Sequence, residues 1–285
     1  MLLAEELGAE IVAADSMQVY KGMDIGTAKP TPEERARVPH HLVDVVSLKE
    51  SFDVALYRRL ATQAIADIQQ RGRLPLVVGG SGMYLRALTE GLFQVPPLDS
   101  KLRSELELQP AEMLHDRLKQ VDPAAATRIG RQNKRRLVRA LEVFQQTGKP
   151  ISALQVEWAH ARPARPTMIF LERDRDDLYR RIEHRVDWMF AHGLVEETQR
   201  LLANGLVDNP VAGAAAGYRE VAEMLRGAAR TLEETILKTK QRTRQLAKRQ
   251  LTWFRHQARL RRVQAGATAE QTKERVRELV ENARG

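Results

Sequence analysis

A chain of 285 residues with 43% hydrophobic and 29% charged residues has the composition of a folded protein, with room for one large α/β domain or two smaller ones. It has no cysteine, which excludes disulfides, thiolate metal sites and a cysteine nucleophile. No segment approaches the roughly 20 apolar residues that a membrane span needs, and acidic residues stand near the N-terminus where a signal peptide has basic ones, so we expect a cytoplasmic protein.

The amino-terminal part of the sequence has the pattern of a parallel βαβ unit. Residues 10–14 form a short apolar run that predicts a buried strand, and residues 74–78 form a second one that a glycine turn ends. Between them, apolar residues repeat at helical spacing over 54–68, with Ser51 as the expected N-cap and Gly72 as the end of the helix. In open parallel sheets, ligands bind at the carboxyl ends of such strands.

The remainder of the sequence changes character twice. Residues 99–150 are polar and helical without a convincing strand, residues 168–171 predict another core strand, and residues 175–204 are amphipathic. A long helical pattern then covers 232–262. We therefore expect an α/β core over 1–98, a helical insertion over 99–165, and a return to the core with a basic helix over 166–285.

Lysine and arginine concentrate in residues 238–262, which contain ten of them and no aspartate or glutamate. The net charge of the whole chain is +9, and without this segment 36 basic residues stand against 37 acidic ones. The ten are Lys238, Lys240, Arg242, Arg244, Lys248, Arg249, Arg255, Arg259, Arg261 and Arg262. A local cationic surface of this kind indicates a polyanionic partner.

The segment directly after the first strand reads DSMQVYKGMDIGTAKP, from Asp15 to Pro30. A lone Asp in this position is commonly a helix N-cap or a turn residue. The functional interpretation is a general base, because a carboxylate at this edge of the sheet is placed to accept a proton from a nucleophile bound above it.

Two further loops have both a structural and a functional interpretation. Residues 79–82 read GGSG, which is typical of a tight turn but also lets a phosphate or base approach the backbone at a helix N-terminus. Gly217, Tyr218 and Arg219 follow the small-residue run 212–216, which is also typical of a flexible loop.

Two basic stretches have the pattern of helices. Residues 133–142 read NKRRLVRALE, whose spacing fits a solvated face with Leu137 and Leu141 packed inward and leaves the arginines free to lie on another face. Residues 243–255 read TRQLAKRQLTWFR. A basic helix is most often only solvated, but two aromatic residues beside cations favour nucleic acid, whose phosphates supply affinity without reading the sequence.

Together these motifs resemble the tRNA dimethylallyltransferases, which prenylate an adenine in tRNA, and the resemblance extends to about residue 262. It rests mainly on the strings at 15–30 and 243–255, and on VVGGSGMYLRALTEG at 77–91. It implies a P-loop NTPase-like parallel α/β sheet with an inserted all-helical domain. The implied activity is transfer of a dimethylallyl group from dimethylallyl diphosphate to N6 of the adenosine 3′-adjacent to the anticodon.

The resemblance also assigns roles to residues. Asp15 would take the proton from the adenine amino group, and Arg219 would face the diphosphate, which a planar guanidinium can pair with bidentately. The residues expected to contact tRNA are Asp15, Ser16, Met17, Gln18, Ser81, Arg103, Arg135, Arg136, Leu137, Val138, Arg139, Gly217, Tyr218, Arg219, Lys248 and Arg249. The implied cofactor is Mg²⁺, and the partners are the tRNA anticodon stem-loop and dimethylallyl diphosphate. We expect a monomer without a membrane partner.

One part of the family pattern is absent from the sequence. The family holds the diphosphate and its metal with a P-loop, G-x-x-x-x-G-K-[ST], after its first strand, and the chain contains no such string. Residues 1–8 resemble the end of the helix that follows the P-loop. We therefore expect the first strand, the P-loop and the start of that helix to lie upstream of Met1, through a gene-start error or a truncation, with a genuine remnant as the alternative.

Two other functions remain open on the sequence. One is the same chemistry on free adenylate, although a mononucleotide requires neither the basic helix nor the inserted module. The other is a catalytically impaired tRNA-binding remnant, which follows if the phosphate cradle is truly lost.

Overall fold

The computed structural model describes residues 1–92, 96, 99–160, 168–228, 230–257 and 260–281. The chain divides into two compact units, one of Met1–Thr89 with Pro166–Gly285 and the other of Glu90–Arg165. The second unit thus begins nine residues before the boundary expected from the sequence, and residue 98 at that boundary lies outside the described residues.

The first unit contains a three-stranded parallel sheet with β1 (Glu10–Ala13) at its centre. β1 pairs on one side with β2 (His40–His41) and on the other with β3 (Pro75–Val78). All four residues of β1 are buried, as expected for a central parallel strand covered on both faces. The βαβ unit predicted from the sequence is confirmed, whereas β2 is too short to have a recognisable pattern.

The helix between β1 and β3 is α3 (Val54–Gln70), which buries Tyr57, Ala61 and Ile68. Its N-cap is Asp53, whose side chain accepts hydrogen bonds from the amides of Ala55 and Leu56, so the prediction of Ser51 was wrong. A capping oxygen must stand directly before the first helical residue to reach the free amides, and Ser51 is too early.

The carboxyl-terminal half of this unit contains a second sheet, in which β4 (Met168–Glu172) pairs in parallel with β5 (Leu260–Gln264). The helical pattern of the sequence predicts one helix up to residue 262, but α13 (Leu232–Arg255) ends earlier. The backbone of 260–264 instead forms a ladder with β4, and Val263 turns into the protein interior. A pairing partner some 90 residues away overrides the local pattern.

The amphipathic stretch predicted over 175–204 is two helices rather than one. α10 (Arg175–Ala191) and α11 (Leu194–Ala203) are separated by Gly193, whose φ of 98° lies in the left-handed region that glycine adopts freely. A 3₁₀ turn (Ala212–Ala214) and α12 (Tyr218–Leu225) follow. The first three residues of the small-residue run are therefore a 3₁₀ turn, and the last two belong to the bend before α12.

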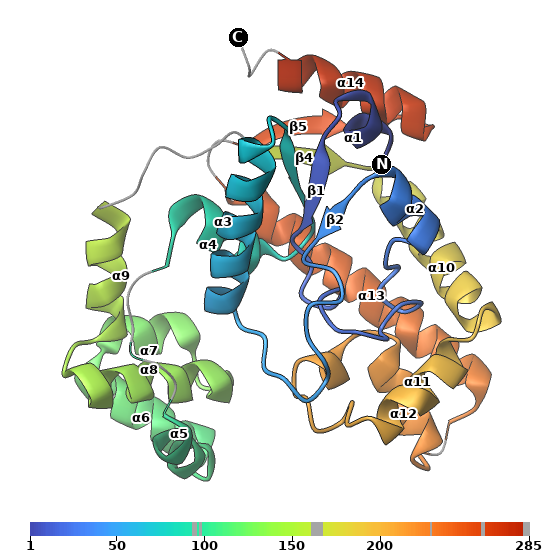
Figure 1. The fold of residues 1–285 in the computed structure, drawn as a ribbon. Helices are drawn as coiled ribbons and strands as arrows, with labels where there is room; N and C mark the ends of the chain where they lie inside the picture. The colour runs from blue at the N-terminus through green and yellow to red at the C-terminus, as the bar shows by residue number, and fades with distance from the viewer. Residues whose placement is uncertain (93–95, 97–98, 161–167, 229, 258–259, 282–285) are drawn as a thin grey trace. The chain divides into compact units, whose positions relative to one another are not determined.

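Short helices complete the first unit, namely α1 (Leu2–Glu6), α2 (Pro32–Arg37), α4 (Gly82–Glu90) and α14 (Ala269–Glu281). Figure 1 shows α1 and α14 side by side, and Lys273 of α14 forms an ion pair with Glu6 of α1 at 2.8 Å. The hydrophobic core of the first unit is one apolar cluster with residues from β1, α3, α4, α10, α11 and α12.

Helices are the only regular elements among the described residues of the second unit. It consists of α5 (Ser100–Glu107), α6 (Ala111–Val121), α7 (Pro123–Ile129), α8 (Lys134–Thr147) and α9 (Ile151–His160). Its own core contains Leu106, Leu114, Leu118, Leu137 and Leu141. The predicted class, a parallel α/β core with an all-helical insertion, is confirmed. Within the described part of the chain, no helix has the length and apolar character to cross a membrane.

Candidate active site and nucleic-acid interface

Asp15 follows directly on the carboxyl end of β1 and is half-buried. Its Oδ1 accepts hydrogen bonds from the amides of Met17 at 2.7 Å and Gln18 at 3.3 Å. These bonds fix the orientation of the carboxylate. The other oxygen, Oδ2, has no hydrogen bond to any described residue, so it is free to accept a proton from a bound molecule.

The loop after β3 supports the loop that carries Asp15. The Ser81 hydroxyl accepts a hydrogen bond from the amide of Ser16 at 3.1 Å, and the Ser81 amide donates to the carbonyl of Ala14 at 3.1 Å. A side chain at Gly79 would come within 2.2 Å of the same carbonyl, so only glycine allows this approach. Asp15, Ser16 and Ser81, which the sequence proposed separately, are therefore adjacent.

Met17 and Gln18, the next two residues of the loop, make contacts of different kinds. Met17 packs against the core, while the Gln18 side chain donates to the carbonyls of Thr27 and Ala28, both at 3.2 Å. Gln18 thus closes the loop 15–30 on itself, with its own backbone amide bonded to Asp15.

Arg185 on α10 was missed by the sequence analysis. Its side chain is accessible, yet the protein around it lowers its pKa by desolvation, whereas the nearby carboxylate of Asp15 raises it. An accessible cation whose charge is coupled to a candidate base is typical of the wall of a catalytic site. α10 contains several arginines, and only the fold distinguishes the one that approaches Asp15.

Arg219, the sequence candidate for the diphosphate, lies on the surface of α12. Its Nε forms an ion pair with Glu223 at 2.8 Å, which raises the pKa of Arg219. Arg219 and Glu223 line a hollow of about 310 Å³ together with residues of the segment 206–226.

The two residues before Arg219 are inside the protein. Tyr218 is completely buried, and Gly217 is buried with a φ of 91°. The Tyr218 hydroxyl lies 2.5 Å from a carboxylate oxygen of Glu197. The Tyr218 side chain therefore cannot reach RNA in this structure.

The predicted RNA contacts of the helical unit fall into two groups. Arg135 and Arg136 are exposed on α8, whereas the Leu137 and Val138 side chains are completely buried in the core of the unit. Arg139 and Arg103 are held by the buried carboxylate of Glu142, with Oε2 at 2.9 Å from Arg139 and 3.9 Å from Arg103. Only Arg135 and Arg136 combine full exposure with a charge that no described carboxylate pairs.

The cations of α13 and the following strand are not all unopposed, because carboxylates far away in the sequence pair with several of them. Lys240 bonds to Asp187 at 2.7 Å, Arg242 to Glu220 at 3.3 Å and Arg262 to Glu172 at 3.6 Å, and Arg244 pairs with Glu183. Those without an ion pair to any described residue are Lys238, Lys248, Arg249, Arg255 and Arg261, while Arg259 lies outside the described residues.

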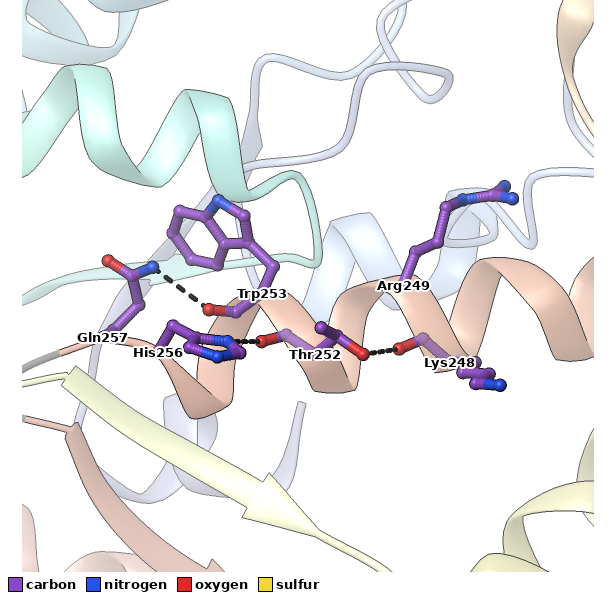
Figure 2. A pocket seen from close by; sticks show the side chains of 6 residues that line it. All are labelled: Lys248, Arg249, Thr252, Trp253, His256 and Gln257. Atoms are coloured by element: carbon purple, nitrogen blue, oxygen red, sulfur yellow. Dashed lines mark hydrogen bonds between the residues drawn. The ribbon is translucent and has the colours of Figure 1, made fainter. Parts of the chain in front are cut away.

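Lys248 and Arg249 lie at an open hollow of about 430 Å³, which they line with Thr252, Trp253, His256 and Gln257. Arg249 and Trp253 point to one side of the helix, one helical turn apart, and Gln257 follows just beyond the end of the helix (Figure 2). Trp253 packs so closely on Gly82 that an added side chain there would lie 2.5 Å from the indole ring. The Gln250 side chain donates to the carbonyl of Gly80 at 3.2 Å.

This arrangement brings a base and a cationic surface together. The glycine turn 79–82 contacts the Asp15 loop on one side and α13 on the other. A half-buried carboxylate with a free oxygen suits proton abstraction, and an aromatic ring beside free cations suits a nucleic-acid strand. No group of three or more potential metal ligands occurs among the described residues.

Comparisons with known proteins give a consistent result. The family described as IPP transferase matches residues 18–257. A tRNA dimethylallyltransferase from Geobacter metallireducens is 51% identical over 258 residues, which cover 89% of this chain and 83% of that protein. A second tRNA dimethylallyltransferase, from Moorella thermoacetica, is 50% identical over 270 residues, which cover 90% of this chain and 82% of the other.

Solved structures agree with these relatives. The tRNA isopentenylpyrophosphate transferase from Bacillus halodurans has a TM-score of 0.70 at 40% identity and covers 99% of this chain and 90% of that one. A eukaryotic dimethylallyltransferase acting on tRNA has a TM-score of 0.75 at 30% identity and covers 88% of this chain and 65% of the other. Given this agreement in sequence and fold over most of its length, the chain belongs to the IPP transferase family.

Proposed function

We propose that this protein transfers a dimethylallyl group from dimethylallyl diphosphate to N6 of the adenosine 3′-adjacent to the anticodon of tRNA. The observation that carries the proposal is the Asp15 carboxylate, which two backbone amides orient while its second oxygen stays open. The names of the relatives, tRNA dimethylallyltransferase, supply the substrate class.

The reaction is a nucleophilic substitution in which Asp15 acts as the general base. The adenine amino nitrogen forms a bond with the first carbon of the dimethylallyl group, and the bond from that carbon to the diphosphate oxygen breaks with its electron pair. The nitrogen loses one proton, which the free oxygen of Asp15 accepts. The Ser81 hydroxyl keeps the Asp15 loop in place through the amide of Ser16.

Two arginines are available for the leaving diphosphate. Arg185 is electrostatically coupled to Asp15, while Arg219 is paired with Glu223. We favour Arg185, because a preorganised positive charge is most effective when it stands where negative charge develops. Arg219 remains the second candidate.

Mg²⁺ was expected as the partner of the diphosphate. The described residues contain no cluster of carboxylates and histidines that fits a metal ion. Magnesium is commonly held by substrate phosphates with only one or two protein ligands. We assign no step to it, and a requirement for Mg²⁺ stays a prediction about the substrate complex.

An RNA substrate is favoured over free adenylate by the surface next to Asp15. Lys248 and Arg249 carry charges that no described carboxylate pairs, and they stand beside Trp253. A mononucleotide needs no such surface, whereas a tRNA anticodon stem-loop supplies phosphates and unpaired bases. We extend the RNA contact to Ser16, Met17 and Gln18 of the loop, and to Arg135 and Arg136 of α8. We further expect a cytoplasmic monomer.

The test is a transfer assay with the purified full-length protein. Labelled dimethylallyl diphosphate is incubated with an anticodon stem-loop or with adenosine monophosphate, and the products are digested to nucleosides and separated. The expected result is N6-dimethylallyl adenosine from the stem-loop only. Equal transfer to the mononucleotide would establish the free-adenylate reaction instead, and stem-loop binding without product would indicate a binding protein.

A further inference from the structure

Glu197 on α11 is a buried carboxylate that none of the steps of the proposed reaction uses. Its side chain is 2% exposed. Its oxygens accept hydrogen bonds from three consecutive backbone amides of another segment, those of Asp24 at 3.2 Å, Ile25 at 3.1 Å and Gly26 at 3.5 Å. Burying a carboxylate is costly unless it is fully bonded, so this site is built around the turn 24–26.

Tyr218 forms the second half of the same site. Its hydroxyl accepts a hydrogen bond from the Gly26 amide at 3.0 Å and donates to Glu197 at 2.5 Å. Burial, together with the charge of Glu197, raises the pKa of Tyr218, so the hydroxyl keeps its proton and remains a donor. The tyrosine ring occupies the space that a side chain at Gly26 would need, at 2.4 Å from an added Cβ.

The turn 24–26 continues into the residues that hold the Asp15 loop closed. The carbonyls of Thr27 and Ala28 both accept hydrogen bonds from the side-chain amide of Gln18. The backbone amide of Gln18 in turn donates to Oδ1 of Asp15. Covalent and hydrogen bonds therefore connect Glu197 with Asp15.

Lys29 reinforces this connection from the other end of the turn. It is buried, and its ammonium donates to the carbonyl of Tyr20 at 2.8 Å and to the carboxylates of Asp24 and Asp44 at 2.6 and 2.5 Å. The loop is thus anchored on both sides of Thr27 and Ala28, whose carbonyls bond to Gln18. Glu197 and Tyr218 are the anchors that α11 and α12 supply.

We propose that Glu197 is a positioning residue for prenyl transfer, which together with Tyr218 fixes the turn 24–26 and thereby the orientation of the Asp15 carboxylate. The inference rests on the proposed function. It also gives the segment 217–219 a role other than RNA contact, because Tyr218 holds the loop in place from inside the protein.

The test compares Glu197→Gln and Tyr218→Phe with the unmodified protein. Glutamine keeps the shape but replaces one accepting oxygen with an NH₂ group, and phenylalanine removes only the hydroxyl. We expect single-turnover transfer at saturating substrates to fall by between about 10- and 10²-fold, because small misplacements of a catalytic group have effects of this size. The affinity for the stem-loop should stay unchanged, and hydrogen exchange of the amides of 24–26 should accelerate.

Coupling between the two residues is measured with the double variant. If both act through the same turn, the double variant should be little slower than the slower single variant. Multiplicative losses would mean that they act separately and would overturn the proposal of one joint support.

The matched control is Glu10→Gln. Glu10 is a carboxylate of the same unit that is 1% exposed and bonded to Arg71 and His41. It stands at the start of β1, whereas Asp15 follows the end of that strand. The control should lower thermal stability but keep the transfer rate of the folded protein. The proposal fails if folded Glu197→Gln transfers at the unmodified rate, or if Glu10→Gln slows transfer equally. Absence of transfer by the unmodified protein would instead refute the proposed function.

Discussion

The Asp15 loop and the carboxyl-terminal part of α13 are neighbours that are built in opposite ways. In the loop, the side chains of Asp15, Gln18, Thr27 and Lys29 all bond within the protein, and one carboxylate oxygen of Asp15 is left open. On α13 from Lys248 onward, the cations have no paired carboxylate among the described residues, and two of them, Lys248 and Arg249, line an open hollow. Bond formation needs a fixed group, whereas binding a flexible polyanion needs accessible charge. The contrast predicts that rate and affinity can be changed separately.

The largest effect is expected from Asp15→Asn. Asparagine retains the oxygen that accepts from Met17 and Gln18, so the loop should keep its shape, but it cannot take a proton. The transfer rate should fall about 10²–10⁴-fold, while stem-loop affinity stays the same. Single-turnover kinetics and a binding titration measure the two quantities. An unchanged rate would remove Asp15 from the role of base.

The next largest effect distinguishes the two arginines. Arg185→Gln should reduce the transfer rate about 10²–10³-fold, as for other groups that stabilise developing negative charge. Arg219→Gln should have a much smaller effect, because this arginine is engaged with Glu223. Rates measured with saturating stem-loop compare them directly. The reverse order would assign the diphosphate to Arg219.

A smaller effect on binding alone is expected from the double variant Lys248→Gln, Arg249→Gln. Each lost phosphate contact should reduce the log–log salt slope by about 0.7 for a single strand and about 0.9 for a duplex. The transfer rate at saturating RNA should change little. Stem-loop titrations at several salt concentrations give the slope, and an unchanged slope would mean that these residues do not face phosphates.

The smallest effect is expected within the same helix, from Lys240→Gln, Arg244→Gln. These cations are neutralised by Asp187 and Glu183, so the salt slope should stay as it is. The free energy of unfolding should fall by less than about 1 kcal/mol per pair, as for other accessible ion pairs. Urea unfolding measures this. A reduced slope would show that RNA displaces the carboxylates, and would abolish the division of α13 into a paired and a free part.

The individual elements of the core were largely predictable because local patterns specify them. The apolar runs at 10–14 and 74–78 are strands β1 and β3, and the spacing over 54–68 is helix α3. The functional motifs were recognised as sequence strings, and the family they indicate is the one the comparisons find. Periodicity also predicted α13, but not its end at Arg255.

What the sequence alone determined is thus the set of elements, the candidate base and the family. The tertiary structure decided which charges are available. Carboxylates at 172, 183, 187 and 220 neutralise four cations that appear unopposed along the chain. It also turned Tyr218 inward onto Glu197 and brought Arg185 to Asp15. These contacts join residues that are distant in the chain, and local spacing contains no information on which distant side chain will arrive.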